Sequence, residues 1–599
     1  MDEREFRRLI AALREGRVSR RTVLGRLVGL GLAAPFANLL LIDAGAAQTA
    51  GSAAYAPKKA GGGGTLKTLW WEAPTLLNPH FAVGTKDQDA SRIFYEPLAS
   101  WDADGLLVPI LATKVPSRED GDVAADGKSV IWRIKKGVTW HDGQPFTADD
   151  VVFNWQYATD PATAATTIGA YKDTMVEKLD PFSVRVRFAK PTPFWAMPFV
   201  GTLGMIIPKH LFAAYTGVKS RQAPANLKPV GTGPYRFVSF TPGDLVRGER
   251  NPSYHEPDRP YFDAIEMKGG GDAVSAARAV IQTGEYDYAW NLQVEDEILS
   301  RLEKTPDAHG RVALYEGGAV EHIELNSTDP WTVVDGEFSS AKTKHPLLSD
   351  PAVREALGLL IDRDGVHKYI YGRTGLATGN YINNPKPFVS KNTRWEFNVQ
   401  KANEVLDAAG WKRGADEVRA KDGKRLKLVF QTSVNAPRQQ NQEIIKQDCA
   451  KAGIAMELKA ITASVYFSSD VANPDTYRKF HADLQMYTIG MAAPDPQDFM
   501  RQFLSSEIAQ KSNKWQGRNV TRWHSPQYDA QFHAAESELD PVKRAALFIK
   551  MNDMVVGDHA VIPEIYRLGV SGIAKNLKLA LSGWDSNFSF LKDWYRTTT

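Results

Sequence analysis

The stretch from residue 426 to residue 458, LKLVFQTSVNAPRQQNQEIIKQDCAKAGIAMEL, sets the fold class of this chain. A helix is predicted from about Arg438 to Ala452, because Gly453 follows it as a residue typical of helix ends. Apolar residues alternate on either side of this helix as they do on strands; they are Leu426, Leu428 and Phe430 before it and Ile454, Met456 and Leu458 after it. A strand, a helix and a second strand in this order predict an α/β fold.

Other helix starts are marked by capping residues. Asp350-Pro351 and Asp540-Pro541 each place a carboxylate before a proline of the first turn. Asn398 precedes a further helix, which is predicted to stop at Gly410. No tandem repeat of about 20 to 50 residues is present, so a solenoid or a propeller is not expected.

The composition is that of a soluble globular protein that is too long for one core. The chain has 599 residues, of which 43% are hydrophobic and 24% are charged. Two or more lobes are therefore expected. The 15 tryptophans and 20 tyrosines suit a pocket that stacks on solutes, although such rings more often fill large cores.

The N-terminal segment 1–46 is predicted to be a twin-arginine signal peptide. Arg20-Arg21 stands in the run SRRTVL, an apolar stretch follows, and Ala44-Gly45-Ala46 forms a small-residue cleavage site. An uncleaved N-terminal anchor is the alternative. Residues 47–64, which end in four glycines, are expected to form a flexible tether that does not pack, so that folding begins near Thr65.

The net charge of the chain comes from this leader. Its eight arginines and five acidic residues give +3, which equals the formal net charge of the whole chain. The remaining residues therefore sum to zero. This balance removes the electrostatic argument for binding nucleic acid or an anionic membrane.

The sequence does not carry the patterns of catalysis or metal binding. Cys449 is the single cysteine, so no intrachain disulfide can form, and its place on an apolar helix stripe indicates a buried structural thiol. Gly127-Lys128-Ser129 lacks the earlier glycine of a phosphate-binding loop, and Asp126-Gly127 is expected to be a hairpin turn. His141-Asp142-Gly143 is expected to be a turn rather than an acid/base pair. We therefore expect no enzyme, no cofactor and no metal ion.

The segment 126–156, DGKSVIWRIKKGVTWHDGQPFTADDVVFNWQ, resembles the signature region of the extracellular solute-binding proteins of family 5. Within it, Thr147-x-x-Asp150 is a capping box. Further matches follow the family's order between residues 65 and 599: LNPH at 77–80, YEPL at 95–98, VGTGPY at 230–235, RPYFD at 259–263, PAVREAL at 351–357, IDR at 361–363, KAN at 401–403, AAGW at 408–411 and VIP at 561–563. The family comprises the dipeptide-, oligopeptide- and nickel-binding components of ABC importers.

The resemblance implies the fold of a two-lobed periplasmic binding protein of type II, similar to the large cluster C with an extra subdomain. It places lobe I at 65–105, 230–325 and 560–599, an inserted subdomain at 106–229 and lobe II at 326–559. The hinge is expected near Asn326 and His559. Gly231 and Gly233 are expected to allow a tight reversal where the chain re-enters lobe I.

The resemblance also supplies candidate ligand-binding residues. Trp290 and Asn291 match an aromatic–asparagine pair that lines the family's cleft. Weaker matches to other cleft-facing stretches add Thr85, His322, Tyr487, Asp495 and Tyr566. Ordinary core packing is the alternative for each of them.

One departure from the family concerns the ligand's amine. Peptide binders carry an aspartate three residues before the acid of the pair Asp495-Pro496, and this chain has Ala492 there. A buried ammonium without a carboxylate partner costs on the order of several kcal/mol. The resemblance therefore implies that either Asp495 replaces the missing acid or the ligand has no free amine.

The predicted function is capture of a peptide or peptide-like solute by lobe closure, followed by delivery to a heterodimeric ABC permease with its ATPase subunits. The protein is expected to be a periplasmic monomer. A non-peptide cargo such as an oligosaccharide, an opine or a metal chelate is an open alternative. A secreted hydrolase and a chemoreceptor or chaperone-like role are alternatives of other classes.

Overall fold

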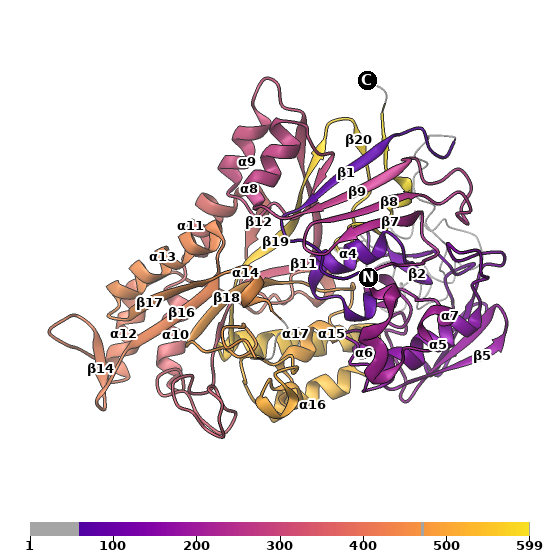
Figure 1. Ribbon diagram of the computed structural model, residues 1–599. Helices are drawn as coiled ribbons and strands as arrows, with labels where there is room; N and C mark the ends of the chain where they lie inside the picture. Colours follow the sequence, from indigo (N-terminus) through magenta and orange to yellow (C-terminus); the bar gives the residue numbers. More distant parts are fainter. Residues whose placement is uncertain (1–58, 469–471, 598–599) are drawn as a thin grey trace, which may run out of the picture.

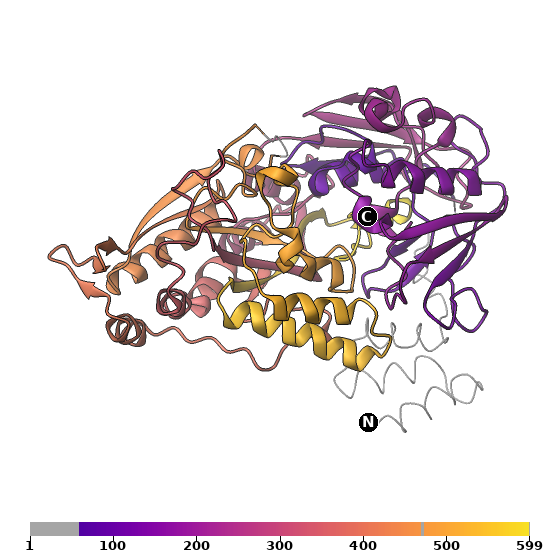
Figure 2. The ribbon, with the colours of Figure 1, turned by 90° about the horizontal axis from the view of Figure 1, so that it is seen from below.

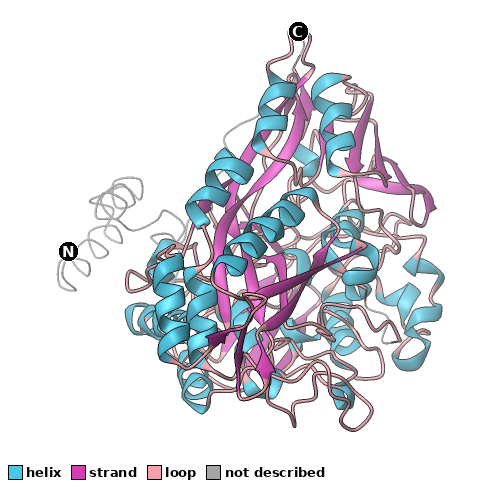
Figure 3. Cartoon of the chain, turned by 90° about the vertical axis from the view of Figure 1, so that its left-hand side faces the viewer, coloured by secondary structure: helices cyan, strands magenta, loops and turns pink. Residues whose placement is uncertain are grey.

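The computed structural model describes residues 59–468 and 472–597. The predicted signal peptide, 1–46, and most of the predicted tether lie outside the described residues. A mixed sheet of eleven strands runs through the molecule, with helices on either side of it (Figure 1, Figure 3). In spatial order its strands are β17 (Ala455–Ile461), β16 (Lys427–Ser433), β18 (Leu484–Ile489), β11 (Gly310–Leu325), β19 (Val561–Ala574), β10 (Tyr288–Ala289), β1 (Thr65–Trp70), β9 (Ala264–Gly269), β8 (Leu245–Arg250) and β7 (Tyr235–Thr241), with β12 (Gly375–Ala377) paired to β19.

Two long antiparallel strands, β11 and β19, connect the two halves of this sheet. In the lobe I half, β10 pairs with β19 at Ile573. In the lobe II half, β18 pairs with β11 from Val320 to Leu325. The β11–β19 register is interrupted between Tyr315 and Ala319. The chain therefore passes from one half to the other at Glu316-Gly317-Gly318.

This interruption does not coincide with Asn326 and His559, where the sequence predicts the hinge. Asn326 directly follows β11, and its side-chain amide donates hydrogen bonds to the carbonyls of Phe480 (2.9 Å) and Ala482 (3.1 Å). His559 lies between the last helix and β19 and adopts a left-handed φ of 52°. Both residues end long elements inside the lobe II half, whereas the break in the ladder lies further along both strands.

The β-α-β unit predicted from residue 426 to residue 458 is confirmed. Strands β16 and β17 pair in parallel, and α13 (Ala436–Lys451) connects them. Gly453 has a φ of 79°, the left-handed conformation that favours glycine after a helix. Cys449 is a buried free thiol within the same apolar cluster as Phe430, and burial raises its pKa.

The predicted helix caps are also confirmed. Asp350 accepts a hydrogen bond from the Ala352 amide before α10 (Pro351–Leu359), and Asp540 does the same for Val542 before α17 (Pro541–Gly557). Asn398 caps α12 (Val399–Ala408). Thr147 and Asp150 form a reciprocal capping box at α5 (Ala148–Thr159). The side-chain oxygens supply partners for amides that a helix start leaves unpaired.

The remaining elements are short. The predicted inserted subdomain contains a three-stranded sheet of β4 (Ser129–Arg133), β6 (Ser183–Phe188) and β5 (Thr174–Asp180) against α5. Other helices are α4 (Gly84–Arg92), α6 (Ile168–Tyr171), α7 (Lys209–Phe212), α8 (Ala273–Ala277), α9 (Asp296–Glu303), α11 (Arg363–Val366), α14 (Ala463–Tyr466), α15 (Gln497–Met500) and α16 (Pro526–Ala535). Short strands are β2 (Ala99–Trp101), β3 (Leu107–Pro109), β13 (Lys412–Arg413), β14 (Arg419–Lys421), β15 (Lys424–Arg425), β20 (Leu577–Lys578) and β21 (Tyr595–Arg596).

The glycines of the VGTGPY motif serve close packing. A Cβ atom on Gly231 would lie 1.8 Å from the Phe94 carbonyl oxygen, and one on Gly233 would lie 2.5 Å from it. The predicted turn at His141 is confirmed, and this histidine hydrogen-bonds to both glycines through its ring nitrogens. The close approach of two backbone segments, rather than a left-handed φ, therefore explains the two glycines.

The end of the predicted tether is not free. Residues Gly61 to Gly64 run along residues 260–263, and the amides of Gly62 and Gly64 donate hydrogen bonds of 2.9 and 3.0 Å to the Asp263 carboxylate. A Cβ on Gly63 would lie 2.8 Å from the Tyr261 carbonyl oxygen. The prediction that this glycine run does not pack is wrong, because the missing side chains allow the backbone to come close.

The apolar core is only partly divided between the two halves. One cluster joins Val353, Phe430 and Met486 within the lobe II half, and another joins Val280 and Leu299 within lobe I. The largest cluster contains residues of lobe I, of the inserted subdomain and of α16 and α17. Figure 2 shows this yellow helix pair beside the purple N-terminal part. None of the helices in the described ranges is long and apolar enough to cross a membrane.

Candidate functional site

The two halves of the molecule contact each other at the start of α13. Asn435, which caps this helix, donates a hydrogen bond of 2.9 Å to Gln293, in the segment between β10 and α9. Gln440, one turn further along α13, donates one of 2.6 Å to Glu295. These contacts join residues of the predicted lobe II to residues of the predicted lobe I. The region beside them is therefore where a solute held by both lobes would lie.

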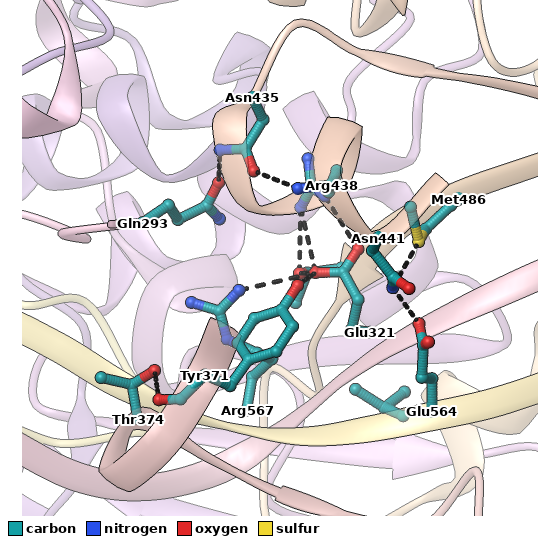
Figure 4. Close-up of polar contacts among 12 residues, drawn as sticks. Gln293, Glu321, Tyr371, Thr374, Asn435, Arg438, Asn441, Met486, Glu564 and Arg567 are labelled. Carbon is teal, nitrogen blue, oxygen red and sulfur yellow. Dashed lines mark hydrogen bonds and ion pairs between the residues drawn. The ribbon is translucent and has the colours of Figure 1, made fainter. Parts of the chain in front are cut away.

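Next to these contacts is a buried group of charges, which we call the crossover ion cluster: Glu321 of β11, Arg438 of α13 and Arg567 of β19 (Figure 4). Glu321 is completely buried and the two arginines are 3% and 5% exposed. Arg438 Nε lies 2.8 Å from Glu321 Oε1, and Arg567 Nη1 lies 3.5 Å from Glu321 Oε2. The Thr488 hydroxyl donates a further hydrogen bond of 2.5 Å to Glu321.

The arginines determine the ionisation of Glu321. Burial alone would raise the pKa of this carboxyl group, but the charges of Arg438 and Arg567 outweigh it and hold the pKa below its ordinary value. Burial alone would lower the pKa of Arg438, and the charge of Glu321 reverses this effect. The cluster is therefore charged at neutral pH although it is removed from water.

A second buried carboxyl group, Glu564 of β19, behaves differently. Burial raises its pKa to about 7, because a hydrogen bond of 2.6 Å from Asn441 and the charge of Arg363 offset the loss of water only in part. Glu564 Oε1 and Arg363 Nη1 have no hydrogen-bond partner among the described residues. Glu564 is thus a proton-exchanging group close to neutral pH.

Arg567 has fewer partners than a buried guanidinium usually has. Its Nε is buried without a hydrogen-bond partner in the described part of the chain, and its one ion pair is the 3.5 Å contact with Glu321. The guanidinium lies over the Tyr371 ring, 4.8 Å from the ring centre. A buried donor without a partner costs on the order of 1–3 kcal/mol, so Arg567 has free capacity for an acceptor.

Glu72 of lobe I faces the same region. It follows β1, it is half-buried, and it makes no hydrogen bond with any residue that the structure describes. Burial raises its pKa, while the charges of Lys86 and of Arg438 lower it. Its neighbour Trp71 stacks with Trp290, and Arg438 of the predicted lobe II lowers the pKa of Glu72, so we place the Glu72 carboxylate near the junction of the two halves.

The structure brings the predicted pair Trp290 and Asn291 to this junction. Trp290 follows β10 and stacks with Trp71 (ring centres 5.6 Å apart) and with Trp70 (6.4 Å). Asn291 has a left-handed φ of 50°, and its carbonyl accepts a hydrogen bond of 2.8 Å from the Trp71 indole. The pair is fixed by this aromatic stack, and Trp290 is 9% exposed. Binding of ligand by these residues stays a prediction.

His322 and Tyr487 lie on the opposite face of the sheet from Glu321, because successive strand residues alternate between faces. The buried His322 ring contacts the Tyr381 and Tyr487 rings at 5.2 and 4.7 Å. The Tyr487 hydroxyl donates a hydrogen bond of 2.9 Å to Glu324. His322 Nε2 has no hydrogen-bond partner among the described residues. Binding of ligand by His322 and Tyr487 stays a prediction.

Tyr566 and Thr85 occupy different surroundings. The Tyr566 hydroxyl donates a hydrogen bond of 3.0 Å to the carbonyl of Gly317, within the interruption of β11, and burial raises its pKa to about 12. Thr85 is half-buried in the first turn of α4. Tyr566 thus supports the crossing point of the strands, and the structure does not bring Thr85 into the hydrogen-bond network of the crossover ion cluster.

Asp495 already has protein partners in this structure. Its two carboxylate oxygens pair with the Arg544 guanidinium, at 2.9 Å for Nη2 and Oδ1, and Oδ1 also accepts the Gln497 amide. The charge of Asp495 is therefore neutralised within its own half. Ala492 itself is exposed just after β18. The hypothesis that Asp495 pairs with a ligand amine has no support from these contacts.

The crossover ion cluster was missed at the sequence level, although the chain carries a signal for it. Glu321 and Arg567 are charged residues inside strands that otherwise read as buried and apolar, AVEHIEL and VIPEIYRLG. Charged residues are almost never fully buried unless they are paired. Arg438 carries no such signal, because its position at the start of a helix is typical of a solvated residue. Among the described residues, no three His, Cys, Asp or Glu side chains come together to hold a metal ion.

Two α/β halves joined by crossing strands, with polar residues of both halves at the junction, define a periplasmic binding protein. The chain belongs to the family described as bacterial extracellular solute-binding proteins, family 5, whose model matches residues 107–511. The glutathione-binding protein GsiB of Shigella flexneri is 24% identical over 519 residues, which cover 86% of this chain and 91% of GsiB.

Two solved structures are similar across the same range. AppA of Bacillus subtilis, an oligopeptide-binding protein in complex with a nonapeptide, superposes with a TM-score of 0.74 and 21% identity, covering 90% of this chain and all of AppA. NikZ of Campylobacter jejuni in complex with Ni(L-His) superposes with a TM-score of 0.74 and 22% identity, covering 89% and 99%. Both confirm the expected fold of two lobes.

Proposed function

We propose that this protein captures a peptide-like solute carrying both an amine and a carboxylate, and delivers it to an ABC permease with its ATPase subunits. The observation that carries the proposal is the incomplete pairing at the junction of the lobes. Among the described residues, Arg567 Nε has no acceptor and the Glu72 carboxylate has no donor. A carboxylate and an ammonium on one ligand would satisfy both, and each charge-assisted hydrogen bond is stronger than a neutral one.

The proposal gives Glu72 the role that the family's missing aspartate would have. It stands at the lobe I side of the junction, near the Trp71–Trp290 stack. A ligand backbone between Glu72 and Arg567 would contact lobe I and the lobe II end of the β11–β19 strand pair at once. Relatives whose names record glutathione or oligopeptide ligands support this class of cargo.

Lobe closure is the mechanism that we infer. The ladder between β11 and β19 is interrupted at Glu316–Gly318, and an interrupted ladder bends more easily than a continuous one, so we place the hinge there. Opening would break the Gln293–Asn435 and Glu295–Gln440 hydrogen bonds. A ligand that contacts both lobes favours the closed form by its additional contacts.

The first test identifies the solute that stays bound to the protein when it is purified from its host. Denaturing the purified protein and identifying the released molecules by mass spectrometry is expected to yield short peptides or peptide-like zwitterions. Release of an oligosaccharide, an opine or a metal chelate would contradict the proposal. We also infer that the protein catalyses no reaction, and turnover of a bound peptide would contradict this.

Matched variants separate the two charged contacts. Glu72→Gln is expected to weaken binding of the identified peptide at least about tenfold, and to leave binding of its N-acetylated form nearly unchanged. Arg567→Lys is expected to weaken binding of the free peptide more than binding of its C-terminal amide. Lys228→Gln, which changes an exposed lysine of the inserted subdomain, serves as the control. Equal losses for free and blocked peptides would contradict the assignment.

We further propose export through the twin-arginine route with cleavage near Ala46, and a periplasmic monomer as the mature form. The run SRRTVL and the site Ala44-Gly45-Ala46 support this. N-terminal sequencing of protein from the periplasm is expected to begin within a few residues of Gln48. Replacing Arg20 and Arg21 by lysine is expected to stop export, and continued export would contradict the route.

A further inference from the structure

A cavity of about 350 Å³ lies in the lobe I half, separate from the junction of the lobes. It is bounded by β11, by β19 and by the segment from β20 to Leu581. The β11 residues that line it are Arg311, Ala313, Leu314 and Tyr315, which precede the interruption of the strand. The crossover ion cluster lies beyond that interruption.

Six of the nine residues that line the cavity are aliphatic. Ile573, Leu577 and Leu581 are buried, and the Tyr315 ring forms part of the wall. Leu314 is 38% exposed, which is unusual for leucine on a central strand. A cavity of this volume lined by aliphatic and aromatic side chains suits a small organic body.

The polar residues of the lining are basic. Arg311 and Lys578 line the cavity and are exposed. Neither side chain makes an ion pair or a hydrogen bond with any residue in the described ranges, and the lining contains no acidic residue. An apolar body beside two unpaired cations is complementary to a molecule with an apolar chain and an anionic head.

The geometry of Tyr315 keeps the cavity open. A Cβ on Gly569 would lie 2.2 Å from the Tyr315 ring, so the ring lies directly over the β19 backbone. The Tyr315 hydroxyl donates a hydrogen bond of 2.9 Å to Asn587, which fixes the ring in this position. The wall is therefore built by specific contacts rather than by a loose side chain.

From these observations we propose that the lobe I cavity is a second binding site, for a medium-chain carboxylate whose alkyl chain lies on Tyr315, Leu579 and Leu581 and whose head group pairs with Arg311 and Lys578. The site goes beyond capture of the transported solute. Its residues take no part in the junction of the lobes, so the two sites can fail independently.

Calorimetric titration of the full mature protein with octanoate, below its micellar concentration, tests the proposal. Octanoate is expected to bind with a stoichiometry of one, and n-octylamine, which has the same chain and the opposite charge, is expected not to bind. No binding of octanoate, or equal binding of the amine, overturns the proposal.

Variants locate the site. The double variant Arg311→Gln/Lys578→Gln is expected to weaken octanoate binding at least about tenfold. The control variant Lys219→Gln/Lys228→Gln removes two exposed lysines of the inserted subdomain and is expected to leave octanoate binding unchanged. Ala313→Phe is expected to abolish binding by filling the cavity. Melting curves and binding of the identified peptide report whether each variant is folded. Unchanged octanoate binding in the folded double glutamine variant also overturns the proposal.

Discussion

The two ends of the β11–β19 strand pair differ more than their shared backbone suggests. At the lobe I end, Gly310–Tyr315 pairs with Gly569–Ala574, and the strands pack apolar residues around a cavity. At the lobe II end, Ala319–Glu324 pairs with residues 561–567, and the same strands bury Glu321, Glu564 and Arg567.

The difference indicates that the lobe I end of the strand pair serves stability and that the lobe II end serves ligand binding. Replacing a buried ion pair by well-packed apolar residues is often neutral or stabilising, so burial of charge is a poor way to hold two strands together. The lobe I end holds the strands with ordinary packing. We infer that the lobe II end keeps its charges because they take part in recognition at the junction.

The largest effect is expected from Glu321→Ala. The change leaves Arg438 and Arg567 buried without their common carboxylate, and such an uncompensated charge costs about 3–5 kcal/mol of unfolding free energy. Denaturant unfolding measures it. Glu316→Gln, at the exposed interruption of the same strand, is the control and should change stability by about 0.5 kcal/mol or less. A loss for Glu321→Ala no larger than the control's would remove the contrast between the two ends.

The second-largest effect is expected to be a dependence of the unfolding free energy on pH, caused by Glu564. Its pKa rises from 4.5 to about 7 on folding, so the folded protein holds a proton in this window that the unfolded chain has released. The unfolding free energy of the wild type, relative to Glu564→Gln, is therefore highest below pH 4.5 and falls as the pH rises through 7. The fall is on the order of 3 kcal/mol. Unfolding curves of both proteins across this range measure it, and a constant difference would contradict the assignment.

At the lobe I end, Gly569→Ala tests packing instead of charge. The added Cβ would overlap the Tyr315 ring, so the unfolding free energy is expected to fall by about 1–3 kcal/mol. Tyr315→Leu in the same chain should restore part of this loss. Gly557→Ala, where the added Cβ meets no atom within 4 Å, is the control. Failure of the second change to compensate would show that the strain lies elsewhere.

The smallest effect is expected where α9 of lobe I contacts the segment next to β12. Arg373 pairs with Asp296 at 2.6 Å and with Glu303, and its side chain is 38% exposed. Arg373→Gln should lower the unfolding free energy by about 1 kcal/mol or less, and by less in high salt. An effect as large as that of Glu321→Ala would mean that the exposed pair, rather than the buried cluster, holds the two halves together.

Local elements could be predicted because local physics decides them. The capping oxygens of Asp350 and Asp540, and the alternation around α13, act over a few residues and need no knowledge of the fold. The glycine run at 61–64 could not be predicted in the same way. Its packing depends on Asp263, which is about two hundred residues away.

The fold class and the candidate site show the same contrast between what near neighbours in the sequence decide and what the tertiary structure decides. The sequence itself determined the α/β class, the order of the elements and the motifs that place the chain in its family, because each rests on contacts between near neighbours. Only the tertiary structure brought Arg438 and Arg567 to Glu321 and paired Asp495 with Arg544. Charge pairing over such separations depends on distance in space, and pairing of β11 with β19 sets those distances.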